Sequence, residues 1–391
     1  MKQCNGSELS VPSFLNNDFL LDIIRRTKND PSITLCHGFK LRPVTDECSS
    51  NESTFRATLH YRSNRFHQER AIDLVVKTPL NDKPSSSTEF RMYTKVLPTM
   101  TKMLEDAGEP FHHPRLISAM QKPHSVLVIE DVSWLGWTAN KLGLNTFQDV
   151  IPMIQEIAKL HAASYNLNQK SCDLTAFNKT LFPRDMNGIH DSISTNIERF
   201  CDTIQTRKDC EKLVSKFQKL KPSLDAKLNH VYAVNPNDSG YNVLNYASVH
   251  TLNILHKTDY AGRVTKTMLT NFQSCSWGSP AIDLLFILNV VVCHDIKLSH
   301  RNEIIYEYYR QFVRILTKLG YLGSVPSLVD LHTELLKKSF FEVYLNIIFD
   351  EASYIGPSED HLNQLNYNGE KYLENIIADM HTLMFKGCLN C

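Results

Sequence analysis

The run IDLVVK at residues 72–77 is the starting point for reading the fold of this chain. Its Ile, Leu and Val residues favour a β-strand, and the strand ends on Lys77. Before it, the segment TFRATLHY at 54–61 alternates apolar and polar residues with a period near two, which predicts another strand. After it, the segment TEFRMYTKVL at 88–97 predicts a helix that carries Glu89 near its start. The predicted order is strand, lysine, loop, and helix with a glutamate.

A further apolar strand is predicted at 126–129 (VLVI), and it ends on the acidic pair Glu130-Asp131. In kinase-type nucleotide sites, a lysine at a strand end contacts phosphate oxygens and is held by a glutamate one helix away. Lys77 and Glu89 are the candidates for this pair. A second interpretation, a structural ion pair without a ligand, explains the same two residues.

The remaining sequence is mostly helical in its pattern. Apolar residues recur at helical spacing in 14–26 and 150–165, and the pattern continues through 196–219. A strand–loop–strand unit is expected at 241–272, whereas nearly every segment from residue 281 onward predicts a helix. Strands concentrated in one part and helices in the other predict an α+β fold.

The change of pattern near residue 135 predicts two lobes. Residues 1–135 are expected to hold an N-terminal helix and the strand-containing, nucleotide-type lobe, and residues 136–391 the helical lobe. A length of 391 residues agrees with two closely packed lobes.

Composition narrows the classes of partner. The 42 basic residues are balanced by 42 acidic ones, so charge gives no reason to expect nucleic acid or an anionic membrane. The longest apolar stretch, 281–293, contains Asp283 and is too short to span a bilayer, so a buried helix is expected. The polar N-terminus lacks the features of a secretory signal, and ten cysteines without a CxxC pair predict free thiols in the cytoplasm.

Four short motifs spread along the chain carry a specific resemblance. They are MYTKVLP at 92–98, VLVIEDV at 126–132, AKLHAAS at 158–164 and GSPAIDL at 278–284. Each resembles a motif of the ecdysteroid-kinase-like family, also called choline-kinase-like (CHK) or juvenile-hormone-inducible proteins. The resemblance extends over about residues 10–385.

The resemblance implies a two-lobed protein-kinase-like fold of the aminoglycoside- and choline-kinase type, as one domain spanning both lobes. It also implies ATP-dependent phosphorylation of a hydroxyl on a small molecule. It assigns nucleotide-binding positions to Lys77, Glu89, Glu130 and Val132, the last two at the strand that links the lobes. It assigns Asp283 an architectural role, in which its carboxylate accepts hydrogen bonds from the catalytic-loop backbone.

The catalytic loop departs from the family pattern. The family reads V-L-V-H-G-D-L-W-V-N-N-I, and this chain reads VLNYASVHTLNI at 243–254, without a gap. Ser248 stands where the resemblance expects the aspartate base, and Tyr246 where it expects the histidine. Asn253 retains the metal-binding asparagine. Further on, the family's I-D-F-Q is here TNFQ, so Asn271 replaces the metal-binding aspartate.

These replacements remove negative charge from the positions of the expected base and of one expected metal ligand. The hydroxyl of Ser248 stays protonated near neutral pH and cannot replace a carboxylate as general base. A general base contributes about a hundred- to ten-thousandfold in rate. Asn253 and Asn271 offer Mg²⁺ only neutral amide oxygens, although this ion prefers carboxylates. ATP and Mg²⁺ are therefore expected to bind weakly or not at all.

Three further features bear on whether the expected site can bind ATP and catalyse transfer. The expected phosphate-covering segment 45–54, TDECSSNEST, has no glycine to bring backbone N–H groups close to phosphates. His250, within the altered loop, is a candidate substitute base because imidazole titrates near neutral pH. Asp238 and Asp259 flank the loop, and their direction stays open.

Three functions follow as hypotheses. The first is a catalytically impaired kinase-fold protein, a pseudokinase, that acts by binding a ligand or a partner. The second is an active kinase for a hydroxyl of a lipophilic small molecule, and the third is an interaction scaffold. A lipophilic small molecule is the expected ligand, and the identity of a protein partner stays open.

Overall fold

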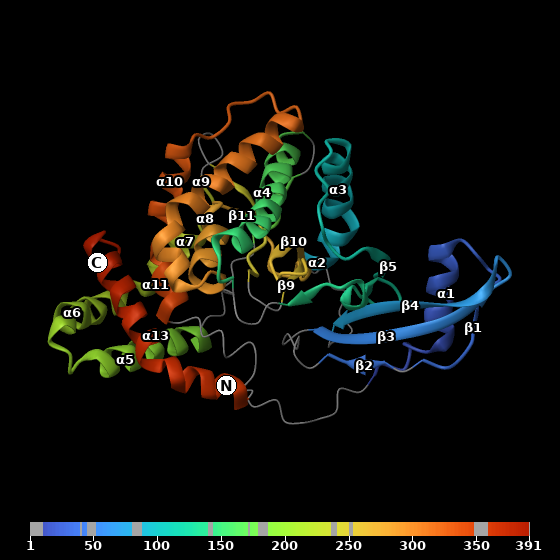
Figure 1. Ribbon diagram of the computed structural model, residues 1–391, viewed down its shortest axis with the longest axis horizontal. Coiled ribbons are helices and arrows are strands. Elements are labelled where there is room, and N and C mark those ends of the chain that lie inside the picture. The colour runs from blue at the N-terminus through green and yellow to red at the C-terminus, as the bar shows by residue number, and fades with distance from the viewer. Residues whose placement is uncertain are drawn as a thin grey trace. The chain divides into compact units, whose positions relative to one another are not determined.

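The computed structural model divides into two compact units, residues Met1–Pro98 with His113–Thr138, and Thr99–His112 with Ala139–Cys391. Figure 1 labels the elements of both. The residues that the structure describes are 11–39, 41–44, 52–79, 88–139, 144–170, 173–178, 187–235, 241–249, 253–347 and 359–390.

The first unit is built on an antiparallel sheet with the strand order β1-β3-β4-β6-β5, to which β2 is added by pairing with β3. The long neighbours β3 and β4 lie side by side in Figure 1. The strands are β1 (Thr34–Leu35), β2 (Arg42–Pro43), β3 (Glu52–Ser63), β4 (Phe66–Pro79), β5 (Leu116–Met120) and β6 (Val126–Glu130).

One face of this sheet packs against the first helix, α1 (Asn17–Lys28). Along β3, alternate residues such as Phe55 and Leu59 are buried and those between them are exposed, as a period of two requires. On α1, Ile23 and Ile24 pack into the same core. The helix begins three residues later than predicted because the side chain of Asn16 caps it, accepting a 3.0 Å hydrogen bond from the Phe19 N–H.

After β4 the chain forms α2 (Thr88–Arg91), the π-helical turn η2 (Met92–Val96) and α3 (Leu97–Asp106). The helix predicted over 88–97 is confirmed, but its π-helical middle was not predicted. The strands predicted at 54–61, 72–77 and 126–129 are also confirmed, each somewhat longer than expected. Two short elements follow β6, namely η3 (Ser133–Leu135) and β7 (Thr138–Ala139).

The second unit is mainly helical. Two of its long helices, α4 (Phe147–Lys170) and α9 (His294–Lys318), pack together and run side by side in Figure 1. The structure also describes the helices α5 (Asn187–Ile204), η4 (Lys208–Cys210), α6 (Glu211–Leu220), η5 (Lys221–Ser223), α7 (Leu224–Tyr232), α8 (Ala281–Phe286), the π-helical η6 (Ile287–Val291), α10 (Leu328–Lys337), α11 (Phe340–Ile347) and α13 (Glu359–Phe385).

Two small antiparallel pairs of strands carry the altered loop in this unit. β8 (Val243–Asn245) pairs with β11 (Ser276–Gly278), and β9 (Ile254–Thr258) pairs with β10 (Val264–Leu269). The strand–loop–strand prediction for 241–272 is thereby confirmed. The apolar stretch 281–293 forms α8 and η6 and is almost entirely buried, as expected.

Some sequence predictions fall outside the described residues. They concern most of the segment 45–54, the candidate base His250 and the flanking Asp238. Within the described parts of the chain, no helix is long and apolar enough to cross a membrane.

Candidate functional site

Lys77 and Glu89 form a buried ion pair in the first unit. The Lys77 Nζ lies 3.0 Å from each carboxylate oxygen of Glu89, and the two side chains are only 6% and 1% exposed. Lys77 belongs to β4, where Thr54 and Leu127 are its partners on the neighbouring strands, and Glu89 is in the first turn of α2. Since a buried charge is stabilised by a charge of opposite sign, each side chain favours the burial of the other.

Glu130 and Val132 lie at the end of β6 in the same unit. The Glu130 carboxylate lies 3.6 Å from the Arg115 guanidinium, and the backbone N–H of Glu130 donates a 2.9 Å hydrogen bond to the Arg115 carbonyl. Val132 is buried, and its carbonyl accepts a 3.0 Å hydrogen bond from the N–H of Leu135, the last residue of η3. These contacts are structural, so the nucleotide-binding role of both residues remains a prediction.

The altered loop of the second unit is held by Asp283. One carboxylate oxygen accepts a 2.6 Å hydrogen bond from the Tyr246 N–H, and the other accepts a 2.8 Å hydrogen bond from the Ala247 N–H. Asp283 is in the first turn of α8 and is fully buried. The backbone hydrogen bonds expected of Asp283 are therefore present.

Ala247 adopts a left-handed backbone conformation, with φ at 53°. The family pattern has glycine here, and alanine in this conformation costs about 1–2 kcal/mol because its Cβ crowds the backbone. The loop therefore retains a glycine-type shape without the glycine, and the hydrogen bonds to Asp283 oppose that strain.

A buried polar chain continues from Asp283 into the helical core. The His161 Nε2 lies 3.0 Å from the Asp283 carboxylate, and the His161 Nδ1 lies 2.8 Å from the Tyr308 hydroxyl. His161 is fully buried between them and is satisfied by these two contacts. Burial raises the pKa of Tyr308 far above its usual value, so this hydroxyl stays protonated.

Ser248 and Asn253 contact each other directly. The Asn253 amide lies 2.5 Å from the Ser248 hydroxyl and 3.4 Å from its carbonyl oxygen, and the side chains are 3% and 8% exposed. Among the residues that the structure describes, no carboxylate hydrogen-bonds to the Ser248 hydroxyl. The position expected to hold a catalytic carboxylate is thus occupied by a neutral serine–asparagine pair.

Tyr246 ties the two ends of the loop together, a contact that the sequence did not predict. Its hydroxyl donates a 2.9 Å hydrogen bond to the Asn253 carbonyl, which also accepts from the Thr270 hydroxyl at 2.9 Å and the Thr270 N–H at 3.1 Å. The only signal in the sequence was a larger, hydroxylated residue in place of the histidine. Tyr246 is fully buried and packs edge-on against Phe272.

Asn271 follows Thr270 directly, so the backbone brings it close to Asn253. Its own side-chain oxygen accepts a 3.4 Å hydrogen bond from the Gln273 N–H, a local turn interaction. Asp259, the flanking carboxylate that the structure describes, binds Arg263 through two nitrogens at 2.9 and 2.7 Å, and this contact lowers the Asp259 pKa. The Asp259 carboxylate therefore stabilises the turn at residues 259–263.

The donor set around Ser248, Asn253 and Asn271 does not fit a protein-held Mg²⁺. Its oxygens come from an alcohol and two amides, and none carries formal negative charge, whereas Mg²⁺ sites are built on carboxylates. The amide of Asn253 is also already directed at Ser248. No chemical step can therefore be assigned to a magnesium ion bound by these residues alone.

A strand-containing unit with a buried lysine–glutamate pair, and a helical unit with an aspartate-held loop, define a kinase-like α+β fold. The sequence model of the ecdysteroid kinase-like family matches residues 52–321. The chain therefore belongs to the ecdysteroid kinase-like family.

Solved structures with a similar backbone include three small-molecule kinases. An ethanolamine kinase from Plasmodium vivax is 9% identical, with 90% of this chain and 84% of that chain covered and a TM-score of 0.38. An aminoglycoside phosphotransferase from Streptomyces rimosus, in complex with ADP and streptomycin, is 12% identical, with 85% and 97% covered and a TM-score of 0.29. A choline kinase from Streptococcus pneumoniae is 10% identical, with 92% and 99% covered and a TM-score of 0.30.

At these identities and TM-scores, none of the three indicates the substrate of this chain. No curated protein matches it.

Proposed function

We propose that this chain is a kinase-fold protein that binds a small molecule or a protein partner and in which phosphoryl transfer is severely impaired. The observation that carries the proposal is the contact between the Ser248 hydroxyl and the Asn253 amide, at the position of the base. Neither group can take a proton from an acceptor hydroxyl near neutral pH. A loss of about a hundred- to ten-thousandfold follows from the missing base alone.

The same proposal retains a weak nucleotide site. Lys77 is positioned by Glu89 at 3.0 Å, the arrangement that directs an ammonium group toward phosphate oxygens. Any Mg²⁺ would be carried by the phosphates of the nucleotide, because Asn253 and Asn271 supply no charge. The nucleotide then binds weakly. Binding of a second molecule in the helical unit does not require phosphoryl transfer.

Titration calorimetry with Mg–ATP and a transfer assay with labelled ATP test this proposal on the full chain. The acceptors are a panel of lipophilic alcohols, including an ecdysteroid. We expect weak ATP binding that is lost in Lys77→Met, retained in the surface control Lys28→Met, and accompanied by transfer no faster than background. Robust acceptor phosphorylation that Lys77→Met abolishes would overturn the proposal.

Because Lys77→Met takes the ammonium group away from the buried Glu89 carboxylate, the assay also includes the double variant Lys77→Met/Glu89→Met. That variant buries no unpaired charge and separates a loss of binding from a loss of folding. ATP binding that persists in the folded double variant would place the nucleotide elsewhere.

An active kinase is the second candidate, favoured by one observation. Asp283 holds the loop backbone at 2.6 and 2.8 Å, so the loop keeps its shape although its reactive groups are replaced. An acceptor with an already acidic hydroxyl needs less help from a base. Transfer to such an acceptor, above background and dependent on Lys77, would favour this candidate.

A further inference from the structure

The helical unit contains a pocket of about 380 Å³ where η6, the start of α9, α11 and α13 meet. Its apolar lining includes Val292, Leu345 and Ile376, and its polar lining includes His294 and Asp379. This volume falls in the range of pockets that bind small molecules, about 300–1,000 Å³. None of the residues discussed above as the kinase-type site belongs to this lining.

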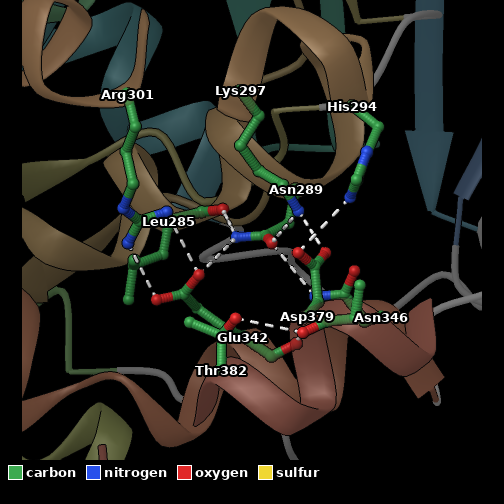
Figure 2. Close-up of polar contacts among 10 residues, drawn as sticks. Leu285, Asn289, His294, Lys297, Arg301, Glu342, Asn346, Asp379 and Thr382 are labelled. Carbon is green, nitrogen blue, oxygen red and sulfur yellow. Dashed lines mark hydrogen bonds and ion pairs between the residues drawn. The ribbon is translucent and has the colours of Figure 1, made fainter. Parts of the chain in front are cut away.

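One wall of the pocket is a network of buried polar side chains, shown in Figure 2. The Lys297 ammonium group, only 6% exposed, contacts the Asp379 carboxylate and lies 3.2 Å from the side-chain oxygen of Asn289. That same oxygen accepts a 3.0 Å hydrogen bond from the Asn346 amide, and the Asn289 amide donates to the Leu285 carbonyl at 2.7 Å. The side-chain oxygen of Asn289 therefore connects η6 to α9 and α11, whereas its amide bonds back to the preceding turn.

A second ion pair is joined to the first through Asn289 and Asn346. Arg301 donates two hydrogen bonds to Glu342, at 3.1 and 2.8 Å. The Asn289 amide lies 3.5 Å from the same carboxylate, and the Asn346 amide donates to the Glu342 carbonyl at 2.7 Å. Lys297 and Arg301 thus each have a negative partner, and these two ion pairs carry no net charge.

The backbone at this wall is also unusual. Asn289 lies in the π-helical turn Ile287–Val291, directly after α8. Such turns are less stable than a regular helix and occur often at functional sites. The turn is a second, independent feature that coincides with the pocket.

His294, the first residue of α9, presents an imidazole that the network does not satisfy. Among the described residues, neither ring nitrogen has a hydrogen-bond partner, although both are buried. The Asp379 carboxylate lies 3.4 Å from Nε2, within ion-pair distance of a protonated ring, but makes no hydrogen bond to it. A neutral imidazole has one donor and one acceptor to offer a ligand.

The charges of the lining balance and therefore do not favour an ionic ligand of either sign. Lys297 is matched by Asp379, and the two other charged residues of the lining, Lys371 and Asp295, have opposite signs. No Phe, Tyr or Trp is present among the described lining residues, although a quaternary ammonium group is best bound by such rings. An uncharged molecule with a compact apolar body is the ligand that fits.

We propose that this pocket binds an uncharged small molecule whose hydroxyl or carbonyl group hydrogen-bonds to His294 and whose apolar body packs on Leu345 and Ile376. This inference rests on the small-molecule binding proposed above and names its site. The two remain separable, because binding here requires neither a nucleotide nor Lys77.

Three adamantane derivatives of one skeleton test the proposal, namely 1-adamantanemethanol, 1-adamantanemethylamine and 1-adamantanecarboxylate. Each is titrated into the full chain without nucleotide, and binding is measured by calorimetry. Protection of Cys293, which lines the pocket, from thiol alkylation provides a second readout. We expect the alcohol to bind at least tenfold more tightly than the amine or the carboxylate and to protect Cys293.

Variants locate the binding. His294→Ala should weaken binding of the alcohol about three- to tenfold, the value of one hydrogen bond, whereas His294→Gln, which keeps a donor and an acceptor, should retain most of it. Leu345→Trp should block the pocket, with circular dichroism to confirm folding. His300→Ala, the same change on the same helix outside the pocket lining, should bind as the unmodified chain does.

Equal or tighter binding of either charged derivative would overturn the proposal, and so would binding that His294→Ala and Leu345→Trp both leave unchanged. Absence of binding by all three derivatives would overturn it as well. A negative ATP titration with positive binding of the alcohol would count against the nucleotide site and leave the pocket standing. The reverse result would count against the pocket alone.

Discussion

The amide of Asn253 lies 2.5 Å from the hydroxyl of Ser248, and this contact occupies the position where a kinase of this family is expected to hold a carboxylate. Both side chains are buried and neutral, so neither is left to accept a proton. The surrounding backbone is nevertheless well supported by Asp283. The loop thus combines a retained shape with altered reactive groups.

Restoring the carboxylates should restore transfer. For the double variant Ser248→Asp/Asn271→Asp, we expect Lys77-dependent transfer to an acceptor alcohol to rise by about a hundredfold or more, because a general base contributes about that much. Labelled-ATP assays measure the rise. The control Ser248→Asn/Asn271→Asp regains one carboxylate without the base and should stay near background. A folded double variant with no gain would show that other losses dominate.

Asp283→Asn should destabilise the protein. The substitution removes a charged acceptor from two backbone N–H groups and from His161, and hydrogen bonds to a charged group contribute about 1.5–3 kcal/mol each. We expect the free energy of unfolding to fall by about 2–4 kcal/mol in a denaturant titration. The exposed control Asp202→Asn should change it by less than about 0.5 kcal/mol. Equal effects of the two changes would contradict this role of Asp283.

Ala247→Gly should stabilise the protein, because glycine adopts the observed φ of 53° without strain. The relief of about 1–2 kcal/mol is offset in part by the greater freedom of glycine in the unfolded chain, which leaves a gain of about 0.5–1 kcal/mol. Thermal and denaturant unfolding measure it. The same change in the middle of α4, Ala158→Gly, should instead cost about 1 kcal/mol or more. A loss of stability at both positions would refute the strain.

Lys77 and Glu89 should be strongly coupled. Lys77→Met or Glu89→Met alone removes one charge of a buried ion pair and keeps the other, and we expect each to lower the free energy of unfolding by about 3–5 kcal/mol. The double variant should lose much less than the sum, since it buries no charge. Unfolding of all four proteins in a double-mutant cycle gives the coupling energy. Losses of the two single variants that simply add in the double variant would show that the two side chains do not stabilise each other.

His256 should make stability depend on pH. Burial lowers the His256 pKa from its usual 6.5 to about 4, and its ring lies 3.0 Å from the Thr267 hydroxyl. Between these values the unfolded chain binds the proton and the folded chain does not, so the free energy of unfolding falls as the pH drops from 6.5 toward 4, by roughly 2–3 kcal/mol.

The variant His256→Asn should flatten this slope in unfolding experiments at pH 4 to 7. The half-exposed His300→Asn serves as the control and should leave the slope intact. A slope that survives His256→Asn must come from other groups.

The sequence alone predicted the α+β fold, the order of its elements and the residues that resemble kinase positions. Strand and helix periods are local, and Lys77 and Glu89 are separated by one loop, so neighbouring segments suffice to predict that pair. The family match over residues 52–321 confirms the resemblance. Replacement of charged by neutral groups at Ser248 and Asn271 is likewise a matter of residue identity and is visible without coordinates.

Only the tertiary structure decided which side chains meet. The contact of Ser248 with Asn253, the tie from Tyr246 and the chain through His161 depend on where folded segments cross, and no period in the sequence encodes such crossings. The pocket at His294 is the clearest case, because Asn289, Lys297 and Asp379 are assembled from the π-helical turn, α9 and α13. Packing of helices distant in sequence brings these groups together, since burying their apolar faces fixes the positions of the polar groups beside them.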